Sequence, residues 1–310
     1  MIGSLKSIPV TGCFLLVLML FIAQACRQRQ GMSAEELERY RKSVDDRHAD
    51  RLDKLRAPNG WLNLVGLHWL EPGENTFGSD SSNTIVFPAG KIAPKAGYFL
   101  LEDTVVTLVA DPAAGIRHNG AAVGRLVQFH PDSARPIEAS SGTLRWTIIR
   151  RESRLGIRLR DDDSELLKTF AGVERFPIDP ELRVTAHLQV TDTIKTIAIT
   201  NVLGQTTQQY SPGTLVFSIH GKTHRLDVLD EEENFFIVFA DSTTGEETYG
   251  GGRFLYVSKQ SDQGEFVVDF NQAINPPCVF TPYATCPLPP RQNRLPVAIR
   301  AGEKNYGEHY

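Results

Sequence analysis

The C-terminal third of the chain holds the side chains whose types and spacing could do chemistry. In TYGGGRFLYV, three consecutive glycines precede Arg253, and their backbone can approach a bound group closely. The planar guanidinium of Arg253 could clamp a carboxylate or a phosphate with two parallel hydrogen bonds. Asp269 and Asn271 follow in the next apolar run, where side chains two residues apart share one face of a strand. An acidic and an amide group on one face could bind a polar ligand or serve acid–base catalysis.

These side chains also have structural interpretations, and the sequence leaves both open. Arg253 could form a buried ion pair with Asp269, and the polar side chains after Asp269 could cap the loop that follows through bonds to its backbone. The functional interpretation predicts one pocket for a small polar or anionic ligand. Its candidate lining residues are Arg253, Asp269, Asn271, Asn275 and Tyr283.

The coil that follows is rich in proline and almost free of charge. Seven of the 18 prolines lie between Pro276 and Pro296, which excludes a helix or a central strand there. An apolar coil of this kind is expected to pack onto the body of the protein. Cys278 and Cys286 lie within it and are predicted to form a disulfide in an oxidising compartment. The alternative is a metal or redox pair, although two cysteines are too few for a structural zinc site.

The N-terminus has the pattern of an export signal. Lys6 precedes the apolar run 13–23, which is too short to span a bilayer. Ala23-Gln24-Ala25-Cys26 resembles a bacterial lipobox, so residues 1–25 are predicted to be a lipoprotein-type signal peptide and Cys26 to be lipidated. Cleavage after Ala25 without lipidation, or an uncleaved anchor, are the alternatives. Because Arg27 follows the cysteine, we expect a lipid anchor in the cell envelope, in the outer rather than the inner membrane, with the protein periplasmic or surface-exposed.

Composition and motif searches narrow the function classes without selecting one. The net charge is −4 with both signs interspersed, so no basic stripe suggests nucleic acid as a partner. The chain has no G-x-S-x-G, H-E-x-x-H, Walker or G-x-G-x-x-G motif, which weakens the common hydrolase and nucleotide-binding classes. We predict no metal site and no particular cofactor. The acidic run 231–233 is interpreted as a solvated turn, and the three tryptophans either stack on sugar rings or belong to the core.

Hydrophobic periodicity predicts a mostly β protein with one helical arm. Ser33 and Glu36 form a capping box that opens a highly charged helix over 34–56. Beyond residue 60 the pattern changes to short runs rich in Val, Ile, Thr and Phe with no βαβ alternation, which favours an antiparallel sandwich or barrel. The predicted strands are 84–87, 105–109, 125–129, 144–150, 155–159, 183–190, 196–200, 215–220, 225–229, 235–239, 254–258 and 265–270. The predicted divisions are 1–25, 26–57 (tether and amphipathic helix), 58–135 (β-sandwich) and 136–310 (antiparallel β domain closed by the Pro-rich coil).

Three long segments resemble the bacterial DUF1684 family. They are GWLNLVGLHWLEPGENTFGSDSSNTIVFP, RRESRLGIRLRDDDSELLKTFAGVERFPIDPELRV and the C-terminal motif described above, and the resemblance extends over about 45–305. It implies a secreted or envelope β protein with no established activity. The motif positions that it marks are Gly252, Arg253, Asp269, Asn271, Asn275, Cys278, Cys286 and Asn293.

Residues 62–120 are similar, more weakly, to a forkhead-associated (FHA) sandwich. The similarity follows Leu70-x-x-Gly73, Phe77-Gly78-Ser79-Asp80 and Asn119-Gly120. That family reads phosphothreonine with an arginine where this chain has Ser79, and the loop 94–97 has no histidine. Because a phosphate dianion needs charge-assisted donors, the resemblance predicts the fold and not the binding activity.

Three functions are consistent with these observations. The first is a binding protein for a small polar or anionic ligand at the C-terminal motif. The second is an envelope hydrolase that uses Asp269 with a distant histidine. The third is a purely structural or interaction module, in which the Pro-rich coil is only a plug. Whether the protein is an enzyme is left open.

Overall fold

A computed structural model describes residues 32–191 and 193–307. The predicted signal peptide and Cys26 lie outside the described residues. The chain forms two compact units, Met1–Asp45 and Asp46–Tyr310. Helix α2 (Ala34–Arg56) begins in the first unit and confirms the predicted helix. Its capping box is formed: the Ser33 N–H donates to Glu36 Oε2 at 2.8 Å, and the Glu36 N–H donates to Ser33 Oγ at 3.2 Å.

Two antiparallel sheets form a sandwich in the first half of the second unit. One has the order β1 (Leu64–Trp69), β11 (Arg154–Asp161), β10 (Leu144–Arg151), β9 (Ala139–Ser141), β6 (Arg117–His118), β7 (Ala121–Ala122). The other has the order β3 (Ile85–Val86), β2 (Gly73–Gly78), β4 (Gly97–Glu102), β5 (Val105–Ala110), β8 (Arg125–Phe129), in which only β2 and β3 are parallel. The core between them is centred on buried aromatic rings of Phe77, Phe99 and Trp146.

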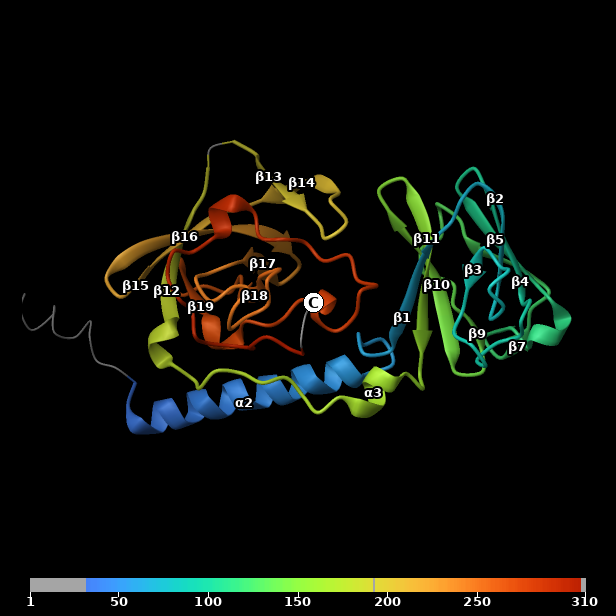
Figure 1. Cartoon of the computed structure of the whole chain (residues 1–310). Helices are drawn as coiled ribbons and strands as arrows, with labels where there is room; N and C mark the ends of the chain where they lie inside the picture. Colours follow the sequence, from blue (N-terminus) through green and yellow to red (C-terminus); the bar gives the residue numbers. More distant parts are fainter. Residues whose placement is uncertain (1–31, 192, 308–310) are drawn as a thin grey trace, which may run out of the picture. The chain divides into compact units, whose positions relative to one another are not determined.

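A second six-stranded antiparallel sheet curls into a nearly closed barrel (Figure 1). Its order is β18 (Arg253–Ser258), β17 (Asn234–Phe239), β16 (Lys222–Glu231), β15 (Gly213–Ile219), β12 (Arg183–Gln189), β19 (Glu265–Asp269), and the edge strands β18 and β19 come into contact. Along β15 alternate residues are buried, as expected for a strand with one face on a core. A separate hairpin is made by β13 (Lys195–Thr200) and β14 (Thr206–Ser211). The prediction of a mostly β, antiparallel protein with one N-terminal helical arm is confirmed.

Short helices connect these strands. They are η1 (Pro112–Ala114), α3 (Glu165–Thr169), η2 (Pro180–Leu182), η3 (Phe270–Gln272), η4 (Pro277–Val279) and η5 (Arg291–Asn293). No helix of the described chain is both long enough and apolar enough to cross a membrane. The predicted division between residues 135 and 136 falls in the connection from β8 to β9. Strands on both sides of it belong to one sheet, because β9 pairs with β6 and β11 pairs with β1.

The Pro-rich coil is packed onto the strands, as its composition predicts. Val279, Phe280, Ala284 and Cys286 are buried. The Thr281 hydroxyl donates to the Leu64 carbonyl of β1 at 3.0 Å, and the Leu288 N–H donates to the Thr200 carbonyl of β13 at 2.8 Å. Asn293 donates to the carbonyls of Asp227 and Val238 at 2.9 and 3.0 Å, which joins the end of the coil to the barrel. The coil is therefore held to the sandwich, to the β13–β14 hairpin and to the barrel.

Candidate functional site

Arg253 is the centre of a fully buried ion pair. Its side chain is 1% exposed, and Nη2 lies 2.8 Å from Asp241 Oδ2, whose side chain is 0% exposed. The same guanidinium donates to the Ile299 carbonyl at 2.8 Å and to the carbonyl of Ala301. Burial lowers the pKa of Arg253, and the Asp241 carboxylate opposes that shift. The guanidinium therefore fixes the C-terminal segment to β18 and does not face a pocket.

The prediction that Asp269 is the partner of Arg253 is wrong. Arg253 lies opposite Phe239 at the end of β17, and the chain reaches Asp241 two residues later. Asp269 ends β19, which contacts β18 where the barrel closes, but its carboxylate is held by the η3 turn. An ion pair was correctly anticipated, but the partner is determined by a pairing between β17 and β18 that is not visible in local sequence.

Asp269 and Asn271 have structural roles. Asp269 caps η3, because its Oδ1 accepts from the Asn271 N–H at 3.1 Å. Asn271 binds the backbone of Asp179, accepting from its N–H and donating to its carbonyl, both at 2.8 Å. The prediction that both side chains share one strand face is wrong, because the strand ends at Asp269 and the chain turns into η3. These contacts match the capping interpretation.

Asn275 and Tyr283 lie apart from this cap. Asn275 is fully buried: its N–H donates to Glu303 Oε2 at 2.6 Å and its Nδ2 donates to the Lys304 carbonyl at 2.7 Å. Its Oδ1 has no hydrogen-bond partner among the described residues. Tyr283 is half-buried in the Pro-rich coil. Of the five candidates, only Asn275 lines one of the larger cavities.

That cavity, of about 410 Å³, is the candidate site, and we name it the arginine cavity. Its walls come from α2, β10, β11, β16, β18 and the Pro-rich coil. Its polar and aromatic lining residues are Arg51, Trp61, Arg151, Arg158, Glu231, Phe254, Tyr256, Asn275, Thr285 and Cys286, and Ile274 and Ala284 are among its apolar ones. Its size is typical of a small-molecule pocket.

Arg158 has the most unusual environment in the cavity. It lies on β11, and its guanidinium carbon is 5.5 Å from the centre of the Trp61 ring, a cation–π geometry. Its buried Nε has no hydrogen-bond partner, and within 32–191 and 193–307 no carboxylate forms a salt bridge with it. Burial and the neighbouring charges of Arg151 and Arg160 lower the pKa of Arg158 to about 10. The protein therefore holds a cation here against a desolvation cost.

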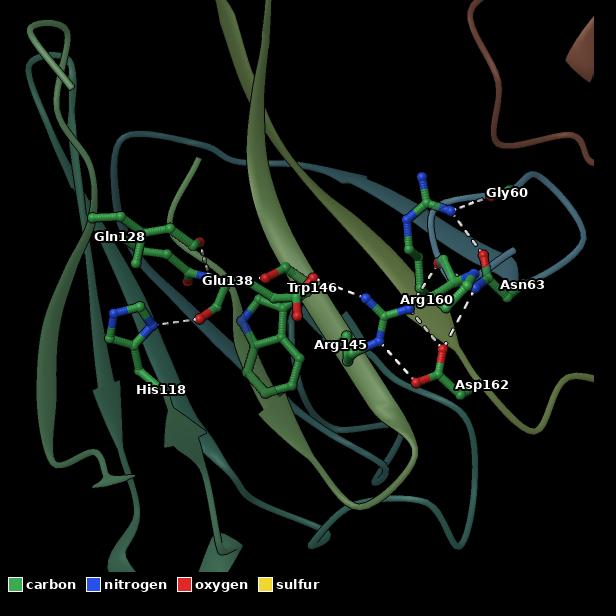
Figure 2. A network of polar contacts seen from close by, with 11 residues as sticks. Gly60, Asn63, His118, Gln128, Glu138, Arg145, Trp146, Arg160 and Asp162 are labelled. Atoms are coloured by element: carbon green, nitrogen blue, oxygen red, sulfur yellow. Dashed lines mark hydrogen bonds and ion pairs between the residues drawn. The ribbon is translucent and has the colours of Figure 1, made fainter. Parts of the chain in front are cut away.

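Arg160, two residues along the same strand face, is satisfied instead (Figure 2). It donates to Asn63 Oδ1 at 2.7 Å and to the Gly60 carbonyl. Beside it, Arg145 holds Asp162 through two hydrogen bonds of 2.8 and 2.7 Å. These contacts fix the turn before β1 to β10 and β11. Arg158 and Arg160 therefore differ in their surroundings although both lie on β11: Arg160 is hydrogen-bonded to the turn before β1, and Arg158 faces the cavity.

Arg51 and Arg151 contribute two more guanidinium groups. Arg51 donates to the Asn275 carbonyl at 3.0 Å, and its Nε lies 3.5 Å from Glu303 Oε1. Arg151 donates to the Thr285 hydroxyl at 3.1 Å. Burial raises the pKa of the Glu303 carboxyl, a shift that the Arg51 charge opposes. Three arginines thus meet at one cavity, with Glu231 as the carboxylate that lines it.

Glu231 and Tyr256 line the opposite side of the cavity. Burial, and secondarily the charge of Glu232, raises the pKa of Glu231. Burial and the nearby Glu231 raise the pKa of Tyr256 to about 12, so its phenol keeps its proton and can donate. The run 231–233 was predicted to be a solvated turn, and all three residues are exposed to solvent. The sequence did not indicate that Glu231 also lines a cavity.

Cys278 and Cys286 are both free thiols in the structure. Each backbone N–H donates to the sulfur of the other residue, at 3.1 Å to Cys286 and 3.3 Å to Cys278. The hydrogen bond between the two side chains lowers the pKa of Cys278 and raises that of Cys286. The coil therefore brings the two sulfurs together beside the cavity, and the disulfide stays a prediction. In the described part of the chain, no group of three or more His, Cys, Asp or Glu side chains could hold a metal ion.

The arginines carry only a weak signal in the sequence. In RRESRLGIRLR, Arg154, Arg158 and Arg160 alternate with apolar residues, and Gly156 takes the remaining position of that face. This alternation indicates a strand with one apolar and one polar face, and it does not distinguish Arg158 from an arginine in solvent.

Comparisons with known proteins place the chain in a family without giving an activity. Residues 168–304 match the sequence model of the family described as "Protein of unknown function (DUF1684)", and the chain belongs to this family through that segment. It is also similar to an uncharacterized protein from Haloarcula marismortui known from a solution NMR structure. The identity is 33%, the alignment covers 47% of this chain and 82% of the other, and the TM-score is 0.39. No curated protein matches the chain.

Proposed function

We propose that the protein binds a small anionic ligand in the arginine cavity. The observation that carries the proposal is the pair of unpartnered polar atoms in its wall, the donor Nε of Arg158 and the acceptor Oδ1 of Asn275. Buried polar groups are normally hydrogen-bonded, and an unmade bond costs about 1–3 kcal/mol. A ligand with an anionic oxygen and a hydroxyl or amide donor would satisfy both atoms.

The charge balance supports an anion in particular. Arg51, Arg151 and Arg158 line one cavity, and Arg158 has no compensating carboxylate among the described residues. A carboxylate or phosphate bound between them would form charge-assisted hydrogen bonds, which are about twice as strong as neutral ones. The protonated Tyr256 phenol supplies another donor.

Isothermal titration of the full chain in detergent with inorganic phosphate, sulfate and succinate tests the proposal. Arg158→Met should weaken binding of whichever anion is held by about tenfold or more, since a charge-assisted bond contributes about 1.5–3 kcal/mol. Arg154→Met is the matched control, because Arg154 lies on the same strand, packs on Trp69 and does not line the cavity. Equal effects of the two substitutions, or no anion bound by the parent protein, would contradict the proposal.

We further propose that this binding takes place in the cell envelope, with the chain lipidated at Cys26. The support is the lipobox-like Ala23-Gln24-Ala25-Cys26. Metabolic labelling with a clickable fatty acid should mark the parent chain and not Cys26→Ser. A weaker proposal is that the sandwich is related to FHA domains. The support for this relation is the two-sheet architecture. Ser79, which stands where FHA domains have their phosphate-binding arginine, does not add to it, because its Oγ donates to the Ile92 carbonyl at 2.9 Å.

The hydrolase hypothesis has less support than anion binding, because Asp269 is engaged within the fold. Both carboxylate oxygens of Asp269 bind the η3 turn, Oδ1 to Asn271 and Oδ2 to Gln272 at 2.7 Å. The hypothesis of a purely structural module keeps support at Arg253, which is paired and buried. It does not explain the cost of leaving Arg158 unpaired.

A further inference from the structure

A second cavity, of about 390 Å³, adjoins the arginine cavity. The two share Arg151, Glu231, Thr285 and Pro287 in their walls, so they are neighbours along these residues. We name the second cavity the amide groove, because the β13–β14 hairpin lines it with three amides and a hydroxyl: Asn201, Gln205, Thr207 and Gln209. Its other walls are carboxylates and apolar side chains: Glu152, Ile199, Leu229, Asp230 and Phe236.

Hydrogen bonds within the hairpin leave both donors and acceptors for a ligand. Asn201 Nδ2 donates to Gln205 Oε1 at 2.9 Å, which fixes that amide and leaves Gln205 Nε2 as a donor. Gln209 Nε2 donates to Thr207 Oγ1 at 3.3 Å, which leaves Gln209 Oε1 as an acceptor. A sugar hydroxyl offers one donor and two acceptor positions, so it can use both kinds of group.

Aromatic side chains line both cavities. Phe236 lines the amide groove and Tyr256 lines the arginine cavity, and their rings are stacked with centroids 5.1 Å apart at 26°. Trp61 adds a half-buried ring on the arginine side. Aromatic rings in the walls suit a ligand that is apolar on the face of a ring and hydroxylated around its edge.

The charges restrict where the ligand carries its acid. Arg151 and Glu231 line both cavities, whereas Arg51 and Arg158 line only the arginine cavity and Glu152 and Asp230 only the amide groove. Asp230 is paired with Lys259 at 2.7 Å. A second anionic group in the groove would meet Glu152 and Glu231, so the charges favour a ligand whose acid lies at the arginine end.

We propose that the two cavities form one site for a saccharide with a single acidic group, the acid between the arginines and a neutral sugar in the amide groove. This inference rests on the proposed anion binding and specifies its ligand class. The acid may be a carboxylate or a phosphate, because both offer the oxygens that guanidinium groups bind.

Titration of the full chain in detergent with four probes tests the inference: glucuronic acid, glucose 1-phosphate, cellobiose and the disaccharide cellobiouronic acid. We expect cellobiouronic acid to bind about tenfold more tightly than glucuronic acid or glucose 1-phosphate, and cellobiose to bind weakly. Gln209→Leu should remove this tenfold gain and leave the affinity for glucuronic acid unchanged. Gln208→Leu is the matched control, because neighbouring side chains on β14 point to opposite faces and Gln208 does not line the groove.

The outcomes separate this inference from the proposed function. If the disaccharide binds no more tightly than the acidic monosaccharides, or if Gln209→Leu and Gln208→Leu act alike, the saccharide inference fails while anion binding stands. If succinate or phosphate binds and none of the four sugars does, the inference fails in the same way. If none of these anions binds, both proposals fail.

Discussion

Two regions of this molecule remove an arginine from water, and they do so in opposite ways. At Arg253 the carboxylate of Asp241 lies 2.8 Å away, and backbone carbonyls accept from both terminal nitrogens. Its buried Nε, like that of Arg158, has no partner among the residues described. At Arg158 the neighbours are an aromatic ring and two further arginines, and no carboxylate of the described chain forms a salt bridge with it. A buried charge is tolerated when it is paired and costly when it is not. The first region therefore compensates its cation with a carboxylate of the described chain, and the second does not.

The strongest test of the paired region is Arg253→Met. We expect the free energy of unfolding to fall by about 3–5 kcal/mol, because the substitution leaves the Asp241 carboxylate buried without its partner. Urea denaturation followed by circular dichroism measures this loss. The double substitution Arg253→Met/Asp241→Leu should recover part of it, since no orphaned charge remains. A single-variant loss below about 1 kcal/mol would show that the pair is unimportant.

The matching test of the unpaired region is Arg158→Met, with the same change in side-chain type. We expect the free energy of unfolding to stay within about 1 kcal/mol of the parent, because the lost contact with Trp61 is offset by relief of the desolvation cost. Denaturation without added anion measures this. If Arg158→Met lowered the free energy of unfolding as much as Arg253→Met does, the two arginines would contribute equally to stability and the contrast between them would be wrong.

Glu303 touches both regions and gives a pH-dependent test. Its carbonyl lies 3.4 Å from Arg253 Nη1, and its carboxyl accepts from the Asn275 N–H. Because burial raises the pKa of Glu303, the folded state binds more protons than the unfolded state between the ordinary and the raised pKa. This contribution to stability is present at low pH and is lost as pH rises through the raised pKa. In Glu303→Gln the decline should be flatter, and a slope equal to that of the parent would contradict the assignment.

The smallest effect is expected where an arginine is paired at the surface. Arg145 contacts Glu138 at 2.9 Å, and the Glu138 side chain is 45% exposed. Exposed ion pairs contribute about 0.2–1 kcal/mol, and Asp162 still holds the guanidinium. Glu138→Gln should therefore change the free energy of unfolding by about 0.5 kcal/mol or less, and less still in high salt. A larger loss would show that pairing, rather than burial, governs these sites.

Local patterns predicted α2 and many of the strands, but not all of them. The capping box at Ser33 and Glu36 and the alternation along strands such as β15 depend on neighbours a few residues apart. The strands β1, β2, β4 and β14 were missed.

The partner of Arg253 and the surroundings of Arg158 depend on which strands meet and on where the Pro-rich coil lies. Asp241 is 12 residues from Arg253 in sequence, and Thr281 contacts β1 across 217 residues. Such contacts follow from tertiary structure, so the sequence could not show that Arg253 pairs with Asp241 or that Asn275 lies in the wall of a cavity.

The arginine cavity takes its walls from two stretches of the chain that the family model divides. Arg51, Arg151 and Arg158 all precede residue 168, where the match to the family model begins, whereas Tyr256, Asn275 and Cys286 lie inside it. The matched segment by itself therefore contains part of the cavity wall and none of its three guanidinium groups. Substitutions at these arginines consequently alter a part of the cavity that the family model does not describe.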